Sequence, residues 1–474
     1  MSEPGSTVTG MKNSSASRSQ GSFVCVECGW TTAKWVGRCG ECQQWGTVEE
    51  RGAAGGAPRT TAGRVATAAL PITEVDITHA QARSTGIGEL DRVLGGGIVP
   101  GGVVLLAGEP GVGKSTLLLT VAAHFAGAVS PGKVLYITGE ESASQVRLRA
   151  ERISALRDNL LLAAETDLAT VLGHIAQQAP QLVIVDSVQT IASAAVDGSA
   201  GGVSQVREVT GALIAAAKAA NIPIILVGHV TKDGSVAGPR ILEHLVDVVC
   251  NFEGDRASSL RLLRAIKNRY GPTDEVGCFA LAESGIIEVP DPSGLFISQS
   301  AARVPGTAIS VTVEGNRALG LEIQALAAPS VLSNPRRTTS GVDSSRLAMI
   351  IAVLQRRLGV QLGNSDVYVS TVGGAKVVDP AADVAIAVAL LSSVLDGPPH
   401  PQVAVLGEIG LSGELRAITG YQRRIAEAAR LGRTKIVAPA GAAKDVQLPK
   451  GVELVEALDL HEALNAAVPK YRKK

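Results

Sequence analysis

The residues with the clearest chemistry are four cysteines near the start of the chain. Cys25, Cys28, Cys39 and Cys42 have the spacing C-x2-C-x10-C-x2-C. Two such pairs can turn their thiolates toward one tetrahedral ion, a geometry that zinc accepts. Because every expected ligand is a cysteine, we predict a closed, structural Zn²⁺ site. Two disulfides or an iron–sulfur cluster are the alternatives; a reducing cytoplasm and the compact spacing argue against them.

A second stretch has the composition of a phosphate-binding loop. The sequence GEPGVGKST matches G-x4-G-K-[ST], follows the apolar run VVLLAG and precedes the helical pattern LLLTVAAHF. Glycines let backbone N–H groups surround phosphates, and the next helix directs its N-terminus at the anion. We expect Lys114 to neutralise phosphate oxygens of ATP and Ser115 to bind Mg²⁺. The predicted nucleotide-binding residues are Gly108, Glu109, Pro110, Gly111, Val112, Gly113, Lys114, Ser115 and Thr116.

Polar side chains follow three further strand-like runs. LVIVDS places Asp186 where a carboxylate would support Mg²⁺. VLYITGEES ends with Glu140 and Glu141, either of which could polarise the attacking water; a charge pair at a helix N-terminus is the alternative. IPIILVGH ends at His229, which could sense the γ-phosphate or have a structural role.

These residues need a sheet whose strands end at one edge. Short runs rich in branched residues alternate with helix-length stretches, which is typical of βαβ units and a buried parallel sheet. We therefore predict an α/β fold, and a further mixed α/β region follows it. The predicted segments are a disordered tail (1–22), the zinc module (23–47), a Gly/Ala-rich linker (48–69), the ATPase domain (70–300) and a C-terminal domain (301–474).

Composition excludes several classes of protein. The 44 Lys and Arg balance the 44 Asp and Glu, so binding to nucleic acid or membrane by bulk charge is excluded. Aromatic residues, at 3%, are too few for an extended base-stacking platform. The first residues lack a secretory signal and no apolar run reaches the roughly 18–20 residues of a membrane span, so we expect a cytoplasmic protein without a membrane partner.

Several motifs together resemble the bacterial RadA (Sms) family of DNA repair ATPases. They are the cysteine module, GIGELDRVLGGGIVPGGVVLLAGEPGVGKST, YITGEES, LVIVDS and the motif Lys267-Asn268-Arg269-Tyr270-Gly271. The resemblance spans nearly the whole chain from residue 23 onward, and Tyr270 replaces the Phe of the family's KNRFG. It implies a RecA-like P-loop ATPase core, ATP hydrolysis stimulated by single-stranded DNA, hexameric rings, and branch migration of recombination intermediates in the RecA pathway.

In this light the KNRYG motif gains a specific interpretation. We expect Lys267 and Arg269 to reach the nucleotide of the neighbouring subunit as arginine-finger analogues; a solvated basic turn is the alternative. In a hexamer, the loops after LVIVDS and VGHVTK would line a central channel. Lys232 and Arg240 are therefore the expected contacts to the phosphates of single-stranded and branched DNA.

The C-terminal region resembles the Lon protease domain. Ala381 stands where that domain has its nucleophilic serine, and Gln422 stands where it has its lysine. Alanine has no nucleophilic hydroxyl and glutamine cannot activate one as a base. We expect a Lon-like α/β fold without peptidase chemistry, serving assembly and DNA binding.

Two other functions remain as alternatives. An ATP-dependent, Lon-like protease is disfavoured by Ala381 and Gln422. A KaiC-like signalling ATPase without a DNA role would share the P-loop and GEES elements, but the cysteine module and KNRYG favour the repair ATPase.

Overall fold

The computed structural model describes residues 22–51, 70–74, 81–127, 132–229, 241–254, 260–298, 304–444 and 446–471. The chain divides into two compact units, 1–76 and 77–474. Lys232 and Arg240, the predicted DNA contacts, lie outside the described residues, as does most of the predicted tail and linker.

The described part of the first unit centres on a three-stranded antiparallel sheet of order β2-β1-β3. Its strands are β1 (Ser22–Cys25), β2 (Thr31–Thr32) and β3 (Val48–Arg51), and the 3-10 helix η1 (Ile72–Glu74) follows later. Cys25, Cys39 and Val48 form a small core beneath Trp30. Because β3 pairs with β1, the zinc module runs to Arg51, four residues into the stretch predicted as a linker.

The second unit begins with a nine-stranded sheet of order β12-β11-β10-β9-β4-β8-β7-β5-β6. Strands β4 to β9 are parallel and largely buried, as their continuous apolar runs predict. They are β4 (Val103–Gly108), β5 (Val134–Thr138), β6 (Leu160–Ala164), β7 (Leu182–Asp186), β8 (Ile224–His229) and β9 (Val248–Gly254). An antiparallel meander extends one edge: β10 (Leu260–Asn268), β11 (Val276–Ala282) and β12 (Gly285–Glu288).

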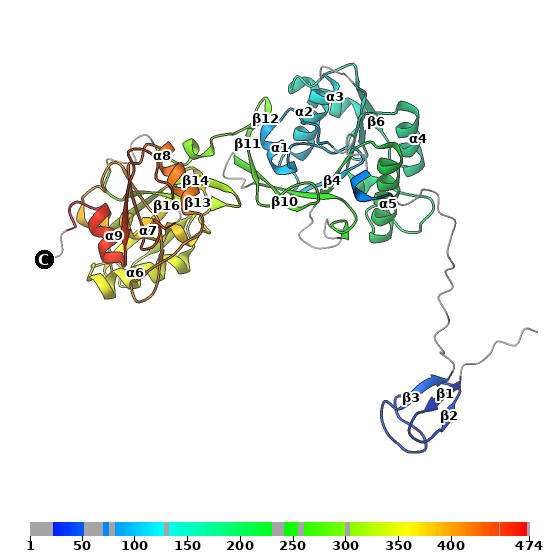
Figure 1. Ribbon diagram of the computed structural model, residues 1–474, viewed down its shortest axis with the longest axis horizontal. Coiled ribbons are helices and arrows are strands. Elements are labelled where there is room, and N and C mark those ends of the chain that lie inside the picture. The colour runs from blue at the N-terminus through cyan, green and yellow to red at the C-terminus, as the bar shows by residue number, and fades with distance from the viewer. Residues whose placement is uncertain are drawn as a thin grey trace, which may run out of the picture. The chain divides into compact units, whose positions relative to one another are not determined.

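Helices cover both faces of this sheet (Figure 1). One face packs against α1 (Gly88–Leu94), α2 (Lys114–Ala126) and α3 (Ala143–Arg152). The other face packs against α4 (Leu168–Gln178) and α5 (Val203–Ala220). A capping box fixes the start of α3, because Ser142 Oγ accepts a hydrogen bond from the backbone N–H of Gln145 and Gln145 Oε1 accepts one from the backbone N–H of Ser142. This pins the helix directly after Glu140 and Glu141.

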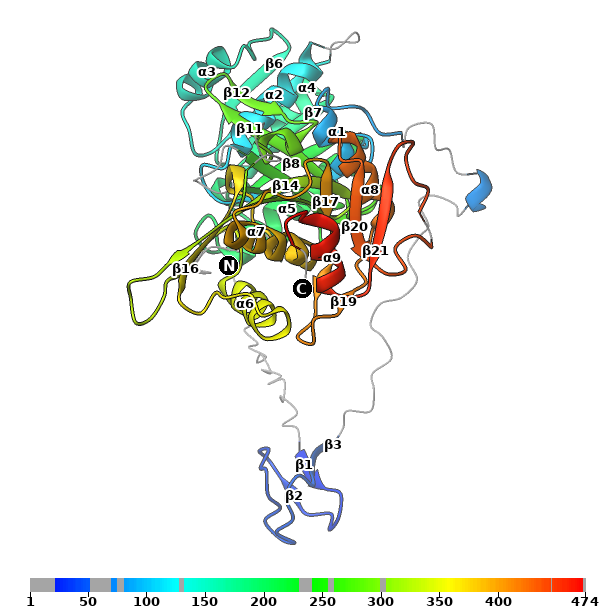
Figure 2. The same cartoon turned by 90° about the vertical axis from the view of Figure 1, so that its left-hand side faces the viewer.

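The remaining residues form a second α/β region (Figure 2). A four-stranded sheet of order β13-β14-β16-β15 packs against α7, whose apolar run lies in the core rather than in a membrane. The strands are β13 (Thr307–Glu314), β14 (Arg317–Pro329), β15 (Arg337–Ser340), β16 (Ser365–Thr371), β17 (Val403–Val405), β18 (Glu408–Ile409), β19 (Leu415–Arg416), β20 (Lys435–Pro439) and β21 (Glu453–Ala457). The helices are α6 (Ser344–Leu358), α7 (Asp383–Leu395), α8 (Tyr421–Arg430) and α9 (Leu460–Ala467). Among the described residues, no helix is long and apolar enough to span a bilayer.

The turn between β13 and β14 joins this region to the ATPase sheet. Arg317 donates to the Glu89 carboxylate on α1 and, at 3.2 Å, to the Val276 carbonyl oxygen. Glu89 also accepts the Cys278 amide at 2.8 Å, and its side chain is only 3% exposed. A buried carboxylate needs such partners, so the charge pair of Glu89 with Arg317 joins the two regions.

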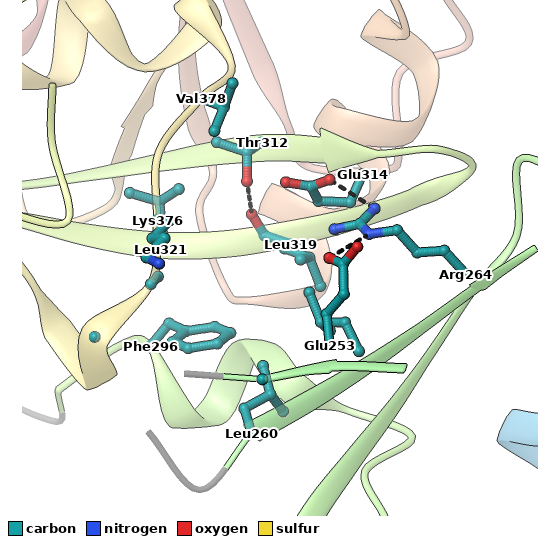
Figure 3. Close-up of a pocket in the computed structure, with 14 residues that line it drawn as sticks. Glu253, Leu260, Arg264, Phe296, Thr312, Glu314, Leu319, Leu321, Lys376 and Val378 are labelled. Carbon is teal, nitrogen blue, oxygen red and sulfur yellow. Dashed lines mark hydrogen bonds and ion pairs between the residues drawn. The ribbon is translucent and has the colours of Figure 1, made fainter. Parts of the chain in front are cut away.

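A cavity of about 340 Å³ lies at this junction, lined by residues of β9, β10, β13 and β14 (Figure 3). Arg264 of β10 lies between two carboxylates there, 2.9 Å from Glu314 and 3.6 Å from Glu253. Leu260, Leu319 and Phe296 form part of its apolar lining. Arg264 therefore links the ATPase sheet to β13 by a second ion pair.

Candidate nucleotide and zinc sites

The predicted phosphate-binding loop connects the end of β4 to the start of α2. Lys114 is 4% exposed, and its Nζ donates to the carbonyl oxygens of Gly108 at 2.8 Å and Glu109 at 3.0 Å. Burial lowers the pKa of Lys114, and the carboxylates of Asp186 and Glu140 act in the opposite direction. The loop therefore holds one cation that faces two carboxylates from neighbouring strands.

Asp186 ends β7, and β8 lies between β7 and β4 in the sheet. Two strand spacings leave about 9–10 Å between the backbones of the loop strand and β7, which is room for a phosphate and its Mg²⁺. Asp186 accepts a hydrogen bond of 2.7 Å from the hydroxyl of buried Tyr136. Burial raises the pKa of Tyr136 well above its usual value, so the phenol remains a donor that orients the carboxylate.

The structure separates the roles available to the two adjacent glutamates. Glu140 Oε1 accepts a hydrogen bond of 2.7 Å from Ser187 Oγ and lies 2.9 Å from His229 Nε2. Glu141 instead pairs with Arg149 of α3 at 2.5 Å. Glu140 thus faces Asp186 and the loop lysine, whereas Glu141 belongs to the start of the helix. Of the two, Glu140 is the one whose charge acts on the loop lysine.

The KNRYG motif lies beside the start of β4, whereas the phosphate-binding loop follows the end of that strand. Asn268 pairs with Val248, which pairs with Val104 near the start of β4. From Val104 to Gly108 the strand rises about 13 Å, which exceeds the reach of an arginine side chain. The motif therefore cannot contact the nucleotide of its own chain.

Within the chain, the motif binds the segment before β9. Lys267 Nζ donates to the carbonyl oxygens of Glu243 and Val246, each at 2.7 Å. Arg269 lies 3.1 Å from the Asp247 carboxylate but remains 52% exposed. Asp247 also accepts the Val103 amide at 3.0 Å. Lys267 is thus occupied by its own chain, and Arg269 is the cation of this motif with an exposed guanidinium.

The motif also contacts the end of α1. The Cα atoms of Gly95 and Gly271 approach so closely that a Cβ on Gly271 would lie 2.9 Å from the Cα of Gly95. Asn268 donates to the Val93 carbonyl oxygen at 3.3 Å. Burial, followed by the charge of Asp247, raises the pKa of Tyr270 to about 12. The position of the motif therefore depends on α1, the helix that also carries Glu89.

The structure brings the four predicted zinc ligands together. The Sγ atoms of Cys25, Cys28, Cys39 and Cys42 all lie within 4.8 Å of one another, with pairs at 3.5 Å and 3.7 Å. Four thiolates about 2.3 Å from a tetrahedral Zn²⁺ would lie about 3.8 Å apart, so the cluster fits that ion. A disulfide requires sulfurs about 2.05 Å apart, which excludes bridges in this arrangement.

In the C-terminal region, the residues at the Lon positions are engaged elsewhere. Ala381 is fully buried in the 3-10 helix η8 (Pro380–Ala382). Gln422 binds the backbone of Gln447, accepting its amide at 2.8 Å. Close by, Oδ2 of Asp379 lies 2.6 Å from Nη1 of the buried Arg424. A charged pair with structural contacts therefore lies beside the two substituted positions.

Three family models match the chain: an AAA domain over residues 72–235, a rubredoxin metal binding domain over 23–50, and the Lon protease (S16) C-terminal proteolytic domain over 352–468. A DNA repair protein RadA of Mycolicibacterium smegmatis is 51% identical to the chain, covering 94% of it and 97% of the relative. The chain belongs to the RadA family. The RadA of Mycobacterium tuberculosis H37Rv is 50% identical over 94% of this chain and 93% of its own length, and that of Streptococcus pyogenes serotype M1 is 43% identical over 95% and 99%.

Membership of the RadA family confirms the predicted fold class, with a RecA-like P-loop ATPase core, an N-terminal zinc ribbon and a Lon-protease-like C-terminal domain. The chain is also similar to the crystal structure of the RadB recombinase, at 23% identity and a TM-score of 0.34, covering 44% of this chain and 99% of that one. The assignment rests on the RadA relatives and the family models.

Four residues at these sites were missed by the sequence reasoning: Tyr136, Ser187, Asp247 and Glu89. Tyr136 and Ser187 carry a weak signal, because each lies within or beside a motif already singled out. Glu89 also lies within a motif already singled out, but its partner Arg317 is distant in sequence, and Asp247 lies in no such motif.

Proposed function

We propose that this chain is a DNA-dependent ATPase of recombinational repair that binds single-stranded and branched DNA and drives branch migration in the RecA pathway. The observation that carries the proposal is the convergence of Lys114, Glu140 and Asp186 at one edge of the parallel sheet. The printed name of the relatives, DNA repair protein RadA, supplies the biological process.

Each residue of the site has a separate role in ATP hydrolysis. The backbone amides of the loop from Gly108 to Thr116 bind the phosphates, and Lys114 exchanges its carbonyl partners for β- and γ-phosphate oxygens. Ser115 and Asp186 hold Mg²⁺, which neutralises charge on the phosphates when bound. Glu140 orients the attacking water and accepts its proton. Until then Ser187 holds the Glu140 carboxylate by its hydrogen bond, and His229 lies beside it.

Hydrolysis depends on a neighbouring copy of the chain in a homo-oligomeric ring, which we propose is a hexamer. Arg269 is the residue that reaches the γ-phosphate in the adjacent subunit, because its own nucleotide is out of range and its guanidinium is exposed. Lys267 supports it by holding the carbonyl oxygens before β9. Coupling hydrolysis to assembly in this way makes a ring active and a free subunit inactive.

DNA binding belongs to the ring as a whole. Lys232 and Arg240 remain the proposed phosphate contacts of the channel, and the peptidase-inactive C-terminal domain assists assembly. Contacts to phosphates give affinity without sequence preference, so binding weakens as salt rises. The protein acts in the cytoplasm.

Branch migration on a strand-exchange intermediate can be measured directly. Synthetic branched DNA is incubated with the full chain and ATP, and the length of the heteroduplex is followed with time. The expected result is extension by the wild-type chain and none by Lys114→Ala, although this variant still binds the DNA. Equal extension by both, or none by either, would overturn the motor function.

A further inference from the structure

Two of the three tryptophans in the zinc module are displayed to solvent. The side chains of Trp35 and Trp45 are 66% and 74% exposed, whereas Trp30 is half-buried against Cys25 and Cys39. Large apolar groups that are exposed next to one another form a patch of the kind that marks interaction sites. Trp30 therefore stabilises the zinc site, and the other two are free for recognition.

The exposed indoles converge on one point of the backbone. Atoms of both rings lie 3.7 Å from the place where a Cβ on Gly37 would be. The Gly46 amide donates to the Gly37 carbonyl oxygen at 2.9 Å, and Arg38 forms an antiparallel bridge with Trp45. The two stretches that carry the rings are thus joined by backbone pairing, and the notch over Gly37 is preformed.

Arg38 stiffens one wall of this notch. Its Nε donates to the Gln43 carbonyl oxygen at 2.9 Å, and its Nη2 donates to Gln43 Oε1 at 2.8 Å. The guanidinium carbon lies 5.9 Å from the centroid of the Trp45 ring, within cation–π range. A ring held in this way loses little freedom when a ligand stacks on it.

The chain segments that build the notch are basic. The stretches 34–38 and 43–47, which build it, contain Lys34 and Arg38 and no acidic residue. The four acids of the module lie elsewhere, at positions 27, 41, 49 and 50. A ligand that offers both a flat aromatic face and adjacent negative charge matches this surface, and an unpaired base with its phosphodiester has both.

We propose that Trp35, Trp45, Lys34 and Arg38 form a stacking notch for an unpaired base of single-stranded DNA. This deepens the proposed function, on which it rests, by giving the zinc module its own DNA contact outside the ATPase core. The low aromatic content excludes an extended stacking platform, but a notch for one or two bases needs only these two rings.

Intrinsic fluorescence tests the notch, because all three tryptophans of the chain lie in this module. The full-length chain is titrated with unlabelled oligo(dT) while tryptophan emission is recorded, and affinity is measured separately by the anisotropy of a labelled oligo(dT). We expect quenching in the wild-type chain and a roughly 5- to 150-fold weaker affinity for Trp35→Ala and Trp45→Ala, as the loss of one base stack predicts. Val26→Ala, at another exposed apolar position of the module, is the matched control and binds as the wild type does.

A second variant guards against unfolding of the module. Lys34→Glu leaves both rings in place, and zinc content is measured for every variant. Lys34→Glu is expected to weaken binding to oligo(dT) several-fold and to lower the salt dependence of binding by about one phosphate contact. If a tryptophan variant loses zinc, Lys34→Glu becomes the variant that tests the proposal. An affinity of Lys34→Glu for oligo(dT) equal to that of the wild type would then overturn it.

The remaining outcomes separate this proposal from the function beneath it. If oligo(dT) binds without quenching, and both tryptophan variants bind it as tightly as the wild type, the notch does not contact DNA and serves a protein partner instead. That result overturns the notch and leaves the DNA-dependent ATPase intact. If the wild-type chain binds no oligo(dT) by either readout and DNA does not change its rate of ATP hydrolysis, both the notch and the proposed function are wrong.

Discussion

His229 Nε2 lies 2.9 Å from Glu140 Oε1, although one residue ends β8 and the other follows β5. Ser187, which follows β7, donates to the same carboxylate oxygen at 2.7 Å. Three strand ends thus converge on one carboxylate, and the adjacent Glu141 is excluded from this group by its pairing with Arg149. The arrangement gives two neighbouring residues of identical chemistry different partners.

The first prediction distinguishes these two glutamates. Glu140→Gln should lower kcat for ATP hydrolysis by roughly 10²–10⁴, the usual contribution of a general base, with little change in nucleotide affinity. Glu141→Gln is the matched control and should retain most of the activity. A steady-state assay over a range of ATP concentrations measures both. Loss of activity in Glu141→Gln alone would reverse the assignment.

The second prediction concerns catalysis across the subunit interface. Lys114→Ala and Arg269→Ala should each be inactive alone, but a mixture should recover roughly a quarter of the wild-type rate, since random assembly combines an intact loop with an intact arginine at about one interface in four. The variants are mixed under conditions of subunit exchange before the assay. A mixture of Lys114→Ala with Glu140→Gln, both changed in the same site, should recover nothing. Recovery in neither mixture would mean that Arg269 does not act in trans.

The third prediction concerns the contact between the ATPase sheet and the C-terminal region. Arg317→Met leaves Glu89 buried without its main partner, which should destabilise the folded chain by about 3–5 kcal/mol. Arg92→Met removes a half-exposed arginine that lies 3.7 Å from the same carboxylate and should cost less than about 1 kcal/mol. Thermal unfolding followed by circular dichroism compares the two. Equal and small effects would show that the buried pair does not hold the regions together.

The fourth prediction concerns removal of zinc. The purified chain should contain one Zn²⁺, and a strong chelator should unfold the module of residues 22–51, because its core consists of the ligands and few other side chains. Tryptophan emission should shift toward that of exposed indole, while the unfolding transition of residues 77–474 stays unchanged, since they form a separate unit. A chelator that alters the second transition as strongly as the first would contradict this division.

The parts of the sites that are local in sequence could be predicted, and the parts that depend on distant contacts could not. The phosphate loop and the cysteine pairs are defined by spacing within a few residues, so pattern and chemistry suffice. The choice between Glu140 and Glu141 depends on which strand ends lie side by side. Arg317 and Glu89 are 228 residues apart, and nothing in either neighbourhood indicates the other.

The KNRYG motif illustrates the same limit. The sequence does not distinguish Lys267 from Arg269, because both are cations in one short motif. The structure differentiates them: Lys267 binds two carbonyl oxygens of its own chain, whereas Arg269 keeps an exposed guanidinium. This difference arises from the segment before β9, whose position depends on how that segment packs at the edge of the sheet.

We expect DNA to control ATP hydrolysis at the site built on Lys114, Asp186 and Glu140. The most direct test of this control is the steady-state rate of ATP hydrolysis by the full-length chain with and without saturating single-stranded DNA. The expected result is a higher kcat with DNA, and loss of both the basal and the stimulated rate in Glu140→Gln. An identical rate with and without DNA, at concentrations where binding is verified by anisotropy, would contradict it.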